Sequence, residues 1–311
     1  MTLTRHWIVG PGALGRLIAL RLAGSAEVTL IARRPLPAEQ TLITPEHATL
    51  VRRVDVALIE ALPSPLPDVV HLTTKAHGAE AAHAALADRL PAGVPLVLWQ
   101  NGFDVQPRLS ERHLGPVLCA TTTEGAHVQD AAQVIHAGHG HTFLGSLAGR
   151  HNDLAVGLAD VLSSAGLPAE AVDDIRVRLW RKLAVNAAIN PLVARSGIRN
   201  GELREAPNRA RVEALLAELS PILAAEGIAP PDGAGIEGWR RLVWQVVEAT
   251  AANRASMLQD VQAGRLTEHE AILAPLLVAA ERHRLAAPVL AEHLAALRAR
   301  ADELAPPGDG C

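Results

Sequence analysis

The sequence predicts an α/β domain built on a doubly wound sheet, followed by an all-helical C-terminal domain. The chain has 311 residues, about twice the size of a common domain. Strand-like and helix-like runs alternate in its first half, which is typical of a parallel sheet covered by helices. From residue 151 onward only helical periodicity is visible. We expect the two domains to span residues 1–170 and 171–311.

The composition is that of a globular protein with a small partner. Hydrophobic residues make up 49% of the chain and charged residues 20%, which excludes a disordered chain. The 29 basic and 33 acidic residues give a net charge of −4, without the basic excess of a nucleic-acid binder. No apolar stretch is long enough to span a membrane, and two distant cysteines form no disulfide framework. We therefore expect a cytoplasmic protein that binds a small molecule and neither nucleic acid nor membrane.

Short runs rich in β-branched residues or leucine mark the strands of the first domain. Helices are expected at Ala13–Ala23 and Gly78–Arg89, after the first and third of these runs. Glycines then punctuate residues 125–149, where the runs Gln133–Ile135 and His141–Leu144 predict hairpin strands that close the edge of the sheet. The expected parallel strands are Trp7–Val9, Val28–Ile31, Val69–Thr73, Val94–Trp99 and Val117–Thr121.

Helical periodicity dominates the second half of the chain. The break at Gly166-Leu167-Pro168 places the start of the second domain near residues 166–174. No segment after residue 151 shows the alternation of a strand, so we expect that part to be all helix. The expected helices are Asp153–Ala165, Asp173–Ile189, Glu205–Glu226, Gly238–Asn253, Thr267–His283 and Pro288–Leu304.

A glycine-rich turn joins the first strand to the first helix, with a G-x-G-x-x-G pattern. In such a turn the first glycine allows a sharp bend, the second lets a pyrophosphate approach the backbone, and the third packs the helix against the strand. The alternative is a tight turn without a ligand, which the flanking strands and helix disfavour. We predict a Rossmann-type dinucleotide site at Gly10, Gly12, Ala13, Leu14 and Gly15.

The end of the second strand indicates which nicotinamide cofactor binds. An acidic residue there would bind the ribose 2′-hydroxyl of NAD, but the sequence has Arg33 and Arg34, with no acid before Glu39. A guanidinium offers a planar fork of donors to a 2′-phosphate. We therefore predict NADPH as the cofactor, with Arg33 as the main contact and Arg34 as a helper. The alternative is that both arginines are solvated loop residues.

Two more polar residues follow predicted strands, where ligands bind in open α/β sheets. Lys75 follows the third strand, and Asn101 follows the fourth and precedes Gly102. We expect both to lie over the cofactor crevice and to hold the ribose, the nicotinamide or the substrate.

A polar stripe runs along one predicted helix of the second domain. Lys182, Asn186 and Asn190 are spaced four residues apart, which keeps them on one helical face. The residues between them are mainly leucine, alanine, valine and isoleucine, so the stripe belongs to a buried helix. Asparagine is a mediocre helix former, and two in mid-helix indicate a role for their amides. The alternative is a satisfied polar network that joins helices.

A set of motifs extends along nearly the whole chain. Its members are Gly10–Gly15, Lys75, Asn101-Gly102, Trp180–Asn186, Asn190–Leu192, Asn200–Leu203, Ser256–Asp260 and Thr267-Glu268. Together, in this order and spacing, they resemble the ketopantoate reductase (2-dehydropantoate 2-reductase) family. The glycine turn is shared by many dehydrogenases, whereas the segments from Trp180 to Leu203 and from Ser256 to Glu268 are the specific parts of the resemblance.

The resemblance implies NADPH-dependent reduction of 2-dehydropantoate to (R)-pantoate in pantothenate biosynthesis. It also implies an N-terminal Rossmann domain and a helical substrate domain. By position, Lys182 matches the general acid and Glu268 the carboxylate that supports it. Positions that bind the substrate match Asn186, Asn190, Asn200 and Ser256, and positions that bind the cofactor match Arg33, Lys75 and Asn101.

Two other functions stay open at this point. The family continues after Thr267-Glu268 with an Asn-Gly pair that this chain lacks, so the substrate can be another 2-oxo acid. A sensor that binds NADPH without chemistry is the second alternative, and the joint presence of Lys182, Ser256 and Glu268 argues against it. The sequence does not fix the oligomeric state, and a homodimer is one of the assemblies it allows.

A histidine cluster at His136, His139 and His141 invites a metal assignment. His139 and His141 would share one face of a strand, but no carboxylate or cysteine lies close in sequence to complete a ligand set. A glycine-rich turn explains the segment better. We therefore predict no metal site.

Overall fold

The computed structural model describes residues 3–173 and 175–304, so Asp174 and Cys311 lie outside the described part. Contacts between residues divide the chain into two units. Unit 1 holds the residues up to Gln100 together with Val105–Arg178. Unit 2 holds Asn101–Asp104 and the residues from Leu179 onward. Within the described residues, no helix is both long enough and apolar enough to cross a membrane.

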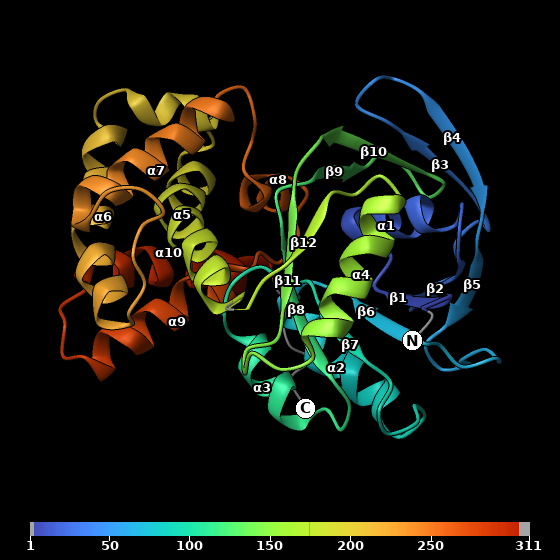
Figure 1. The fold of residues 1–311 in the computed structure, drawn as a ribbon. Coiled ribbons are helices and arrows are strands. Elements are labelled where there is room, and N and C mark those ends of the chain that lie inside the picture. The colour runs from blue at the N-terminus through green and yellow to red at the C-terminus, as the bar shows by residue number, and fades with distance from the viewer. Residues whose placement is uncertain (1–2, 174, 305–311) are drawn as a thin grey trace, which may run out of the picture. The chain divides into compact units, whose positions relative to one another are not determined.

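Unit 1 is built on an eight-stranded sheet with the order β12-β11-β8-β7-β6-β1-β2-β5 (Figure 1). The six strands from β8 to β5 in this order are parallel. β11 runs antiparallel to β8, and β12 runs parallel to β11. The strands are β1 (Arg5–Val9), β2 (Glu27–Ala32), β5 (Asp55–Leu58), β6 (Val69–Leu72), β7 (Leu96–Leu98), β8 (Val117–Thr122), β11 (Thr142–Gly145) and β12 (Ala169–Ala171).

A second sheet of four strands, in the order β4-β3-β10-β9, also belongs to unit 1. Helix α1 (Ala13–Leu22) contacts strands of both sheets and is almost completely buried between them. Its burial explains why the stretch after the glycine turn is almost continuously apolar. The remaining elements are β3 (Glu39–Ile43), β4 (Thr49–Arg53), β9 (Gly125–Val128), β10 (Gln133–Gly138), α2 (Ala76–Ala87), α3 (Val105–Arg112) and α4 (Asn152–Ser164).

Unit 2 is helical, as expected. α5 (Ile175–Ser196) begins in unit 1 and carries the polar stripe of the second domain. The other helices are η1 (Asn200–Arg204), α6 (Asn208–Ala225), α7 (Gly235–Ala249), α8 (Ser256–Gln262), α9 (His269–Arg282) and α10 (Pro288–Leu304). The fold class predicted from the sequence, an N-terminal α/β sheet followed by a helical region, is therefore confirmed.

Three local expectations are wrong. Gln133–Ile135 lies in the second sheet, beside β3 and β9, and does not close the edge of the main sheet. His139 and His141 lie between β10 and β11 and share no strand. Residues after 151 include one strand, β12, which is three residues long and adds to the edge of β11. A strand this short leaves almost no alternation in the sequence to detect.

α5 continues past the expected end at Ile189 and contains Pro191. Proline has no N–H to donate to the carbonyl four residues earlier and usually ends a helix. Here every residue from Ala187 to Ala194 is buried, and the apolar contacts of this turn outweigh the missing hydrogen bond.

Candidate functional site

The glycine turn folds as a tight bend at the end of β1. Gly10 has φ +94°, a conformation that favours glycine, and its N–H donates to the Ile31 carbonyl at 3.1 Å. A Cβ at Gly10 would lie 2.6 Å from the Thr74 side chain. The first glycine of the pattern is therefore required both by the backbone angle and by its neighbour.

The other two glycines differ in their surroundings. A Cβ at Gly15 would lie 2.5 Å from the Gly10 carbonyl oxygen and from Thr73 Oγ1, so α1 packs directly onto the end of β1. Thr73 Oγ1 also donates to the Gly10 carbonyl at 2.8 Å, which fixes the turn. At Gly12 no heavy atom lies within 4 Å of the position of a Cβ, and the residue is exposed. The turn is thus closed on its protein side and open at Gly12, and it fits a dinucleotide pyrophosphate.

The turn lies at the point where the order of strands reverses. β1 pairs with β2 on one side and with β6 on the other, and ligands bind at the carboxyl ends of strands at such a point. Lys75 is the N-cap residue of α2, one residue after Thr74, and it is exposed. Arg33 and Arg34 directly follow β2 and are exposed as well. The predicted cofactor residues of unit 1 therefore lie at one edge of its sheet.

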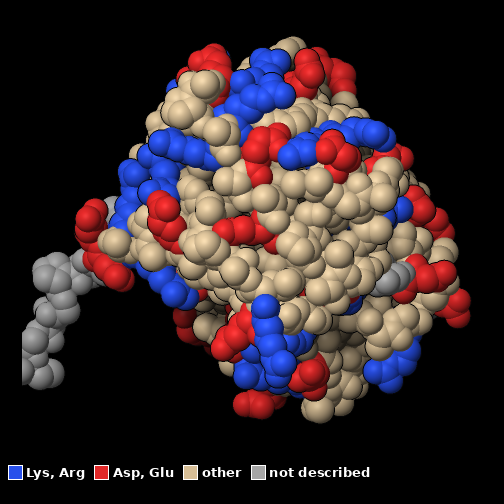
Figure 2. Space-filling view, turned by 90° about the vertical axis from the view of Figure 1, so that its left-hand side faces the viewer, with Lys and Arg blue, Asp and Glu red and all other residues tan. Residues whose placement is uncertain are grey.

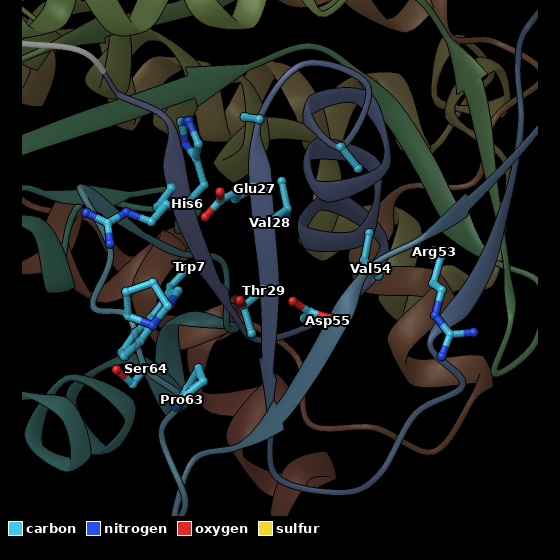
Figure 3. A pocket seen from close by; sticks show the side chains of 14 residues that line it. His6, Trp7, Glu27, Val28, Thr29, Arg53, Val54, Asp55, Pro63 and Ser64 are labelled. Carbon is cyan, nitrogen blue, oxygen red and sulfur yellow. The ribbon is translucent and has the colours of Figure 1, made fainter.

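A separate pocket of about 250 Å³ opens at the opposite edge of the sheet (Figure 3). Its walls include Arg5, Glu27 and Asp55, the first residues of β1, β2 and β5. Because these are the amino ends of the strands, this pocket is not the predicted dinucleotide site.

The polar stripe of unit 2 lies on a single helix, α5. Lys182 and Asn186 are half-buried and Asn190 is 6% exposed, among buried neighbours such as Leu183 and Ala187. Within the described residues, the side-chain amides of Asn186 and Asn190 have no hydrogen bond to another protein group. A satisfied polar network between helices would have used these amides. Their donors and acceptors are therefore open to water or to a ligand.

Lys182 has a carboxylate partner from another helix. Burial lowers the pKa of Lys182 to about 8, while the charge of Glu268 acts to raise it. Glu268 is the N-cap residue of α9 and is 6% exposed. It accepts a hydrogen bond of 3.1 Å from Asn101 Nδ2. The structure thus brings Lys182, Glu268 and Asn101 together in unit 2.

Asn101 reaches this position because the segment Asn101–Asp104 packs against α9. The N–H of Phe103 donates to the Ala271 carbonyl at 3.2 Å, and its ring lies 5.3 Å from the ring of Trp180 on α5. Gly102 has φ +88°, and a Cβ there would overlap the Ala271 carbonyl. Asn101 was expected beside the cofactor, and neither its bond to Glu268 nor the contacts of Phe103 were predicted. The glycine directly after Asn101 was the available signal.

The two remaining predicted residues lie on other elements of unit 2. Asn200 begins η1 and is 7% exposed. Its Nδ2 donates to Thr250 Oγ1 at 2.9 Å, whereas its buried Oδ1 has no partner within the described residues. Ser256 begins α8 and is exposed. Asn200 is therefore positioned by Thr250, the residue that follows α7, and within the described residues one of its polar atoms has no hydrogen bond.

One face of the molecule carries charges of both signs. On the face shown in Figure 2, Lys and Arg side chains alternate with Asp and Glu side chains. That face carries no single-sign stripe of the kind that follows a nucleic-acid backbone.

Comparison with known families covers both parts of the chain. Residues 7–149 match the model of the ketopantoate reductase PanE/ApbA family, and residues 174–301 match the model of its C-terminal part. The chain belongs to the ketopantoate reductase PanE/ApbA family. Its members are reductases of 2-oxo acids that use a nicotinamide cofactor.

Relatives and solved structures agree with this family. The chain is 35% identical to 2-dehydropantoate 2-reductase of Archaeoglobus fulgidus, over 88% of this chain and 89% of that protein. It is 36% identical to the Vibrio cholerae enzyme of the same name, over 91% and 93%. A structure of D-mandelate dehydrogenase with NADH and anilino(oxo)acetate matches with a TM-score of 0.86 at 21% identity, over 97% of this chain and 99% of that one. A dimeric ketopantoate reductase from Staphylococcus aureus matches with a TM-score of 0.81 at 22% identity, over 97% and 100%.

Proposed function

We propose that this protein reduces 2-dehydropantoate to (R)-pantoate with NADPH, and that Lys182 is the general acid. The observation that carries the proposal is the pairing of a desolvated lysine, whose pKa is lowered to about 8, with the buried carboxylate of Glu268. The names of the relatives at 35–36% identity support the substrate. The protein would then act in pantothenate biosynthesis, in the cytoplasm.

The proposed chemistry uses Lys182 at the carbonyl oxygen. A bound nicotinamide supplies the hydride. As the ketone is reduced, negative charge develops on its oxygen, and the Lys182 ammonium stabilises that charge and then donates the proton. A pKa near 8 keeps the group protonated at neutral pH while it remains a better acid than an ordinary lysine. Glu268 orients the ammonium, and Asn101 in turn holds the Glu268 carboxylate.

The substrate would be held by the polar groups that lack protein partners. The amides of Asn186 and Asn190 lie on the same helix as Lys182, and they offer both donors and acceptors to a carboxylate or a hydroxyl. Asn200 and Ser256 are proposed as further contacts on η1 and α8. A 2-oxo acid that also carries a hydroxyl group, such as 2-dehydropantoate, would use such a set of donors and acceptors.

The cofactor proposal rests on the residues around the glycine turn. Gly10, Gly12 and Gly15, with Ala13 and Leu14 at the start of α1, would hold the pyrophosphate. The exposed Arg33, with Arg34 beside it, would bind the 2′-phosphate of NADPH. Lys75 at the start of α2 completes the proposed set in unit 1.

A second candidate is the reduction of a different 2-oxo acid. It is favoured by the absence of the family's Asn-Gly pair in the segment that follows Thr267-Glu268. The likeness to D-mandelate dehydrogenase shows that this fold also accommodates an aromatic oxo acid in that protein. A homodimer is part of the proposal, on the example of the Staphylococcus aureus enzyme.

Steady-state kinetics test the proposal. Oxidation of NADPH and of NADH would be followed with 2-dehydropantoate and a panel of other 2-oxo acids. Lys182→Ala should lower kcat by about 10²-fold or more, and the binding of NADPH should change little. Arg181→Ala is the matched control, because Arg181 neighbours Lys182 on α5 but donates to the Ala229 carbonyl.

Each outcome of these assays separates the alternatives. Equal rates for wild type and Lys182→Ala would remove Lys182 from the mechanism. Turnover with another oxo acid alone would establish the second candidate. Tight NADPH binding without turnover on any acid would establish the sensor.

A further inference from the structure

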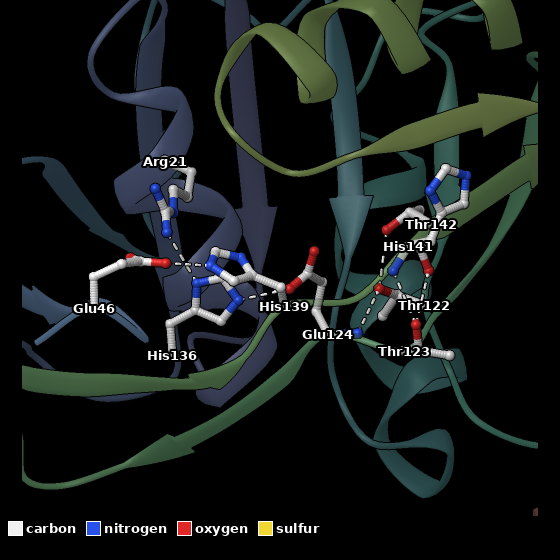
Figure 4. Close-up of polar contacts among 9 residues, drawn as sticks. All are labelled: Arg21, Glu46, Thr122, Thr123, Glu124, His136, His139, His141 and Thr142. Atoms are coloured by element: carbon white, nitrogen blue, oxygen red, sulfur yellow. Dashed lines mark hydrogen bonds and ion pairs between the residues drawn. The ribbon is translucent and has the colours of Figure 1, made fainter. Parts of the chain in front are cut away.

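Three potential metal ligands meet in unit 1 at the end of β10. Glu124 lies in the connection between β8 and β9, His136 lies in β10, and His139 follows that strand. Each offers one ligand atom, and these atoms all lie within 4.8 Å of one another. Figure 4 shows the three side chains converging from these segments. Glu124 is the carboxylate that the sequence around the histidines lacks.

The cluster is buried on one side and open on the other. The side chains of His136 and Glu124 are 0% and 2% exposed, and His136 Nε2 lies 2.6 Å from Glu124 Oε2. The side chain of His139 is 55% exposed and contacts Glu46. The two histidine rings lie 5.2 Å apart and nearly perpendicular. Two ligands are therefore fixed by the protein, and the third faces solvent.

An unpartnered oxygen of Glu124 is an independent sign of a missing ligand. Glu124 Oε1 is buried and has no hydrogen bond within the described residues. Leaving a buried charged oxygen without a partner costs more than leaving a neutral one. A bound cation would satisfy it, whereas the hydrogen bond from His136 to Glu124 Oε2 leaves it unsatisfied.

The hydrogen bond between Arg21 and His136 competes with metal binding at His136. Its Nη2 lies 3.0 Å from His136 Nδ1, and because an arginine only donates, Nδ1 must accept. The ring proton is therefore on Nε2, where it is donated to Glu124. A metal bound at Nε2 moves that proton to Nδ1, so the Arg21 guanidinium must turn away. Arg21 is half-buried, near the end of α1.

We propose that Glu124, His136 and His139 form a Zn²⁺ site. Imidazole and carboxylate ligands suit zinc, with bonds of about 2.0–2.2 Å in a tetrahedral arrangement. Ligand atoms in such an arrangement lie about 3.3 Å apart. The 2.6 Å pair must open slightly, and His139 must move inward. Glu46 or a water takes the fourth position.

Zinc binding to the full-length protein tests the proposal. Zn²⁺ would be titrated against a chromophoric chelator, and Co²⁺ would report a tetrahedral site by its visible absorption. His139→Gln and Glu124→Gln should each weaken Zn²⁺ binding at least tenfold. His141→Gln is the matched control, since His141 is also partly exposed but lies beside Glu170. Arg21→Gln should tighten binding, because an amide oxygen can accept from Nδ1–H.

The results distinguish a built site from chance binding. One zinc per chain in wild type and in His141→Gln, with a loss in His139→Gln, supports the site. Zn²⁺ should raise the Tm of wild type and of His141→Gln, and it should not raise the Tm of His139→Gln. Wild type that binds zinc no better than His139→Gln overturns the proposal, as does an Arg21→Gln variant with weaker binding.

Discussion

At the scale of single residues, the lysines of this chain are unusual in number and in place. The sequence contains two lysines, and the other 27 of its 29 basic residues (29 − 2) are arginines. Both lysines, Lys75 and Lys182, lie at positions predicted to be functional. An arginine stays charged at every accessible pH, whereas burial can shift the pKa of a lysine into the range where it gains and loses a proton. In the proposed reaction Lys182 must donate a proton, which a lysine with a lowered pKa can do and an arginine cannot.

The pH dependence of the reaction should follow the pKa of Lys182. With that pKa near 8, kcat/KM for reduction should fall as the pH rises through about 8, because the ammonium form is lost. The rate of the reverse oxidation should rise over the same range. Glu268→Gln should move the inflection to lower pH, since the Glu268 charge acts to raise this pKa.

Full pH profiles in both directions measure this effect. Glu270→Gln is the matched control, because Glu270 is bound to Arg298 at 2.5 Å and lies next to the site on α9. A wild-type reduction profile that stays flat to pH 10 would rule out Lys182 as the proton donor.

Two buried, hydrogen-bonded histidines, His6 and His71, should make the stability of unit 1 sensitive to acid. Trp99 Nε1 donates to His71 Nδ1 at 3.2 Å, and His71 Nε2 lies 3.0 Å from His6 Nδ1. His71 Nδ1 must therefore accept, and its Nε2–H donates to His6. Burial lowers the pKa of both histidines, so the unfolded chain binds protons that the folded chain excludes.

The free energy of unfolding should therefore be highest above about pH 6.5 and should fall below it, by about 1.4 kcal/mol per pH unit for each histidine that stays neutral. Denaturant unfolding of wild type and His71→Gln from pH 5 to 8 measures the slope. His71→Gln should reduce the slope, whereas His127→Gln should not, because His127 is exposed. Equal slopes in wild type and His71→Gln would contradict this account.

At the scale of elements, local patterns predicted the parts of unit 1 that hold the cofactor. β1, the glycine turn and α1 follow one another within 22 residues, and their signals are strong because each is set by its own sequence. β3 and β4 were not predicted. Exposed residues alternate with less exposed ones along them, and β3 pairs with β10, about 90 residues later. The hairpin of β3 and β4 is local, but its place in the second sheet depends on the pairing of β3 with β10, which the sequence around the hairpin does not reveal.

Substitutions at two glycines of the turn should have different effects on protein stability and on NADPH binding. Gly15→Ala places a Cβ against the Gly10 carbonyl and Thr73, so it should lower the free energy of unfolding by about 1–3 kcal/mol and abolish NADPH binding. Gly12→Ala meets no atom within 4 Å and has φ −75°, so stability should change little. NADPH binding should still weaken at least tenfold. Denaturant unfolding and NADPH titration test both variants, and a Gly12→Ala protein that binds NADPH normally would show that no ligand approaches this turn.

At the scale of the whole molecule, the predicted catalytic residues were found in the sequence because α5 and α9 carry family motifs. What holds them was not predictable. The bond from Asn101 to Glu268 joins residues 167 positions apart. The cluster of Glu124, His136 and His139 brings together the connection between β8 and β9, strand β10 and the residues that follow it. Such contacts depend on which distant segments of the chain pack together in the fold, and the sequence around each residue does not contain that information.

Gly102 lies in the short segment Asn101–Asp104, and its substitution should lower activity. This segment belongs to unit 2, while the residues on both sides of it belong to unit 1. Gly102→Ala would strain a φ of +88° and drive a Cβ into the Ala271 carbonyl. Asn101 would then withdraw from Glu268, and Lys182 would lose the fixed orientation of its carboxylate. We expect kcat to fall at least tenfold, with a smaller change in the Kd for NADPH, because the glycine turn is untouched.

Gly93→Ala is the control that separates backbone strain from the clash with Ala271 as the cause of the expected loss of kcat. Gly93 also has a positive φ, of +107°, but no atom lies within 4 Å of the position of its Cβ. It should lower stability through backbone strain alone, by about 1–2 kcal/mol, and leave kcat unchanged. Parallel measurements of kcat, NADPH binding and Tm on both variants decide the matter. If Gly102→Ala lost stability but kept the wild-type kcat, the bond from Asn101 would not position the Glu268 carboxylate, and the segment would serve only to pack α9.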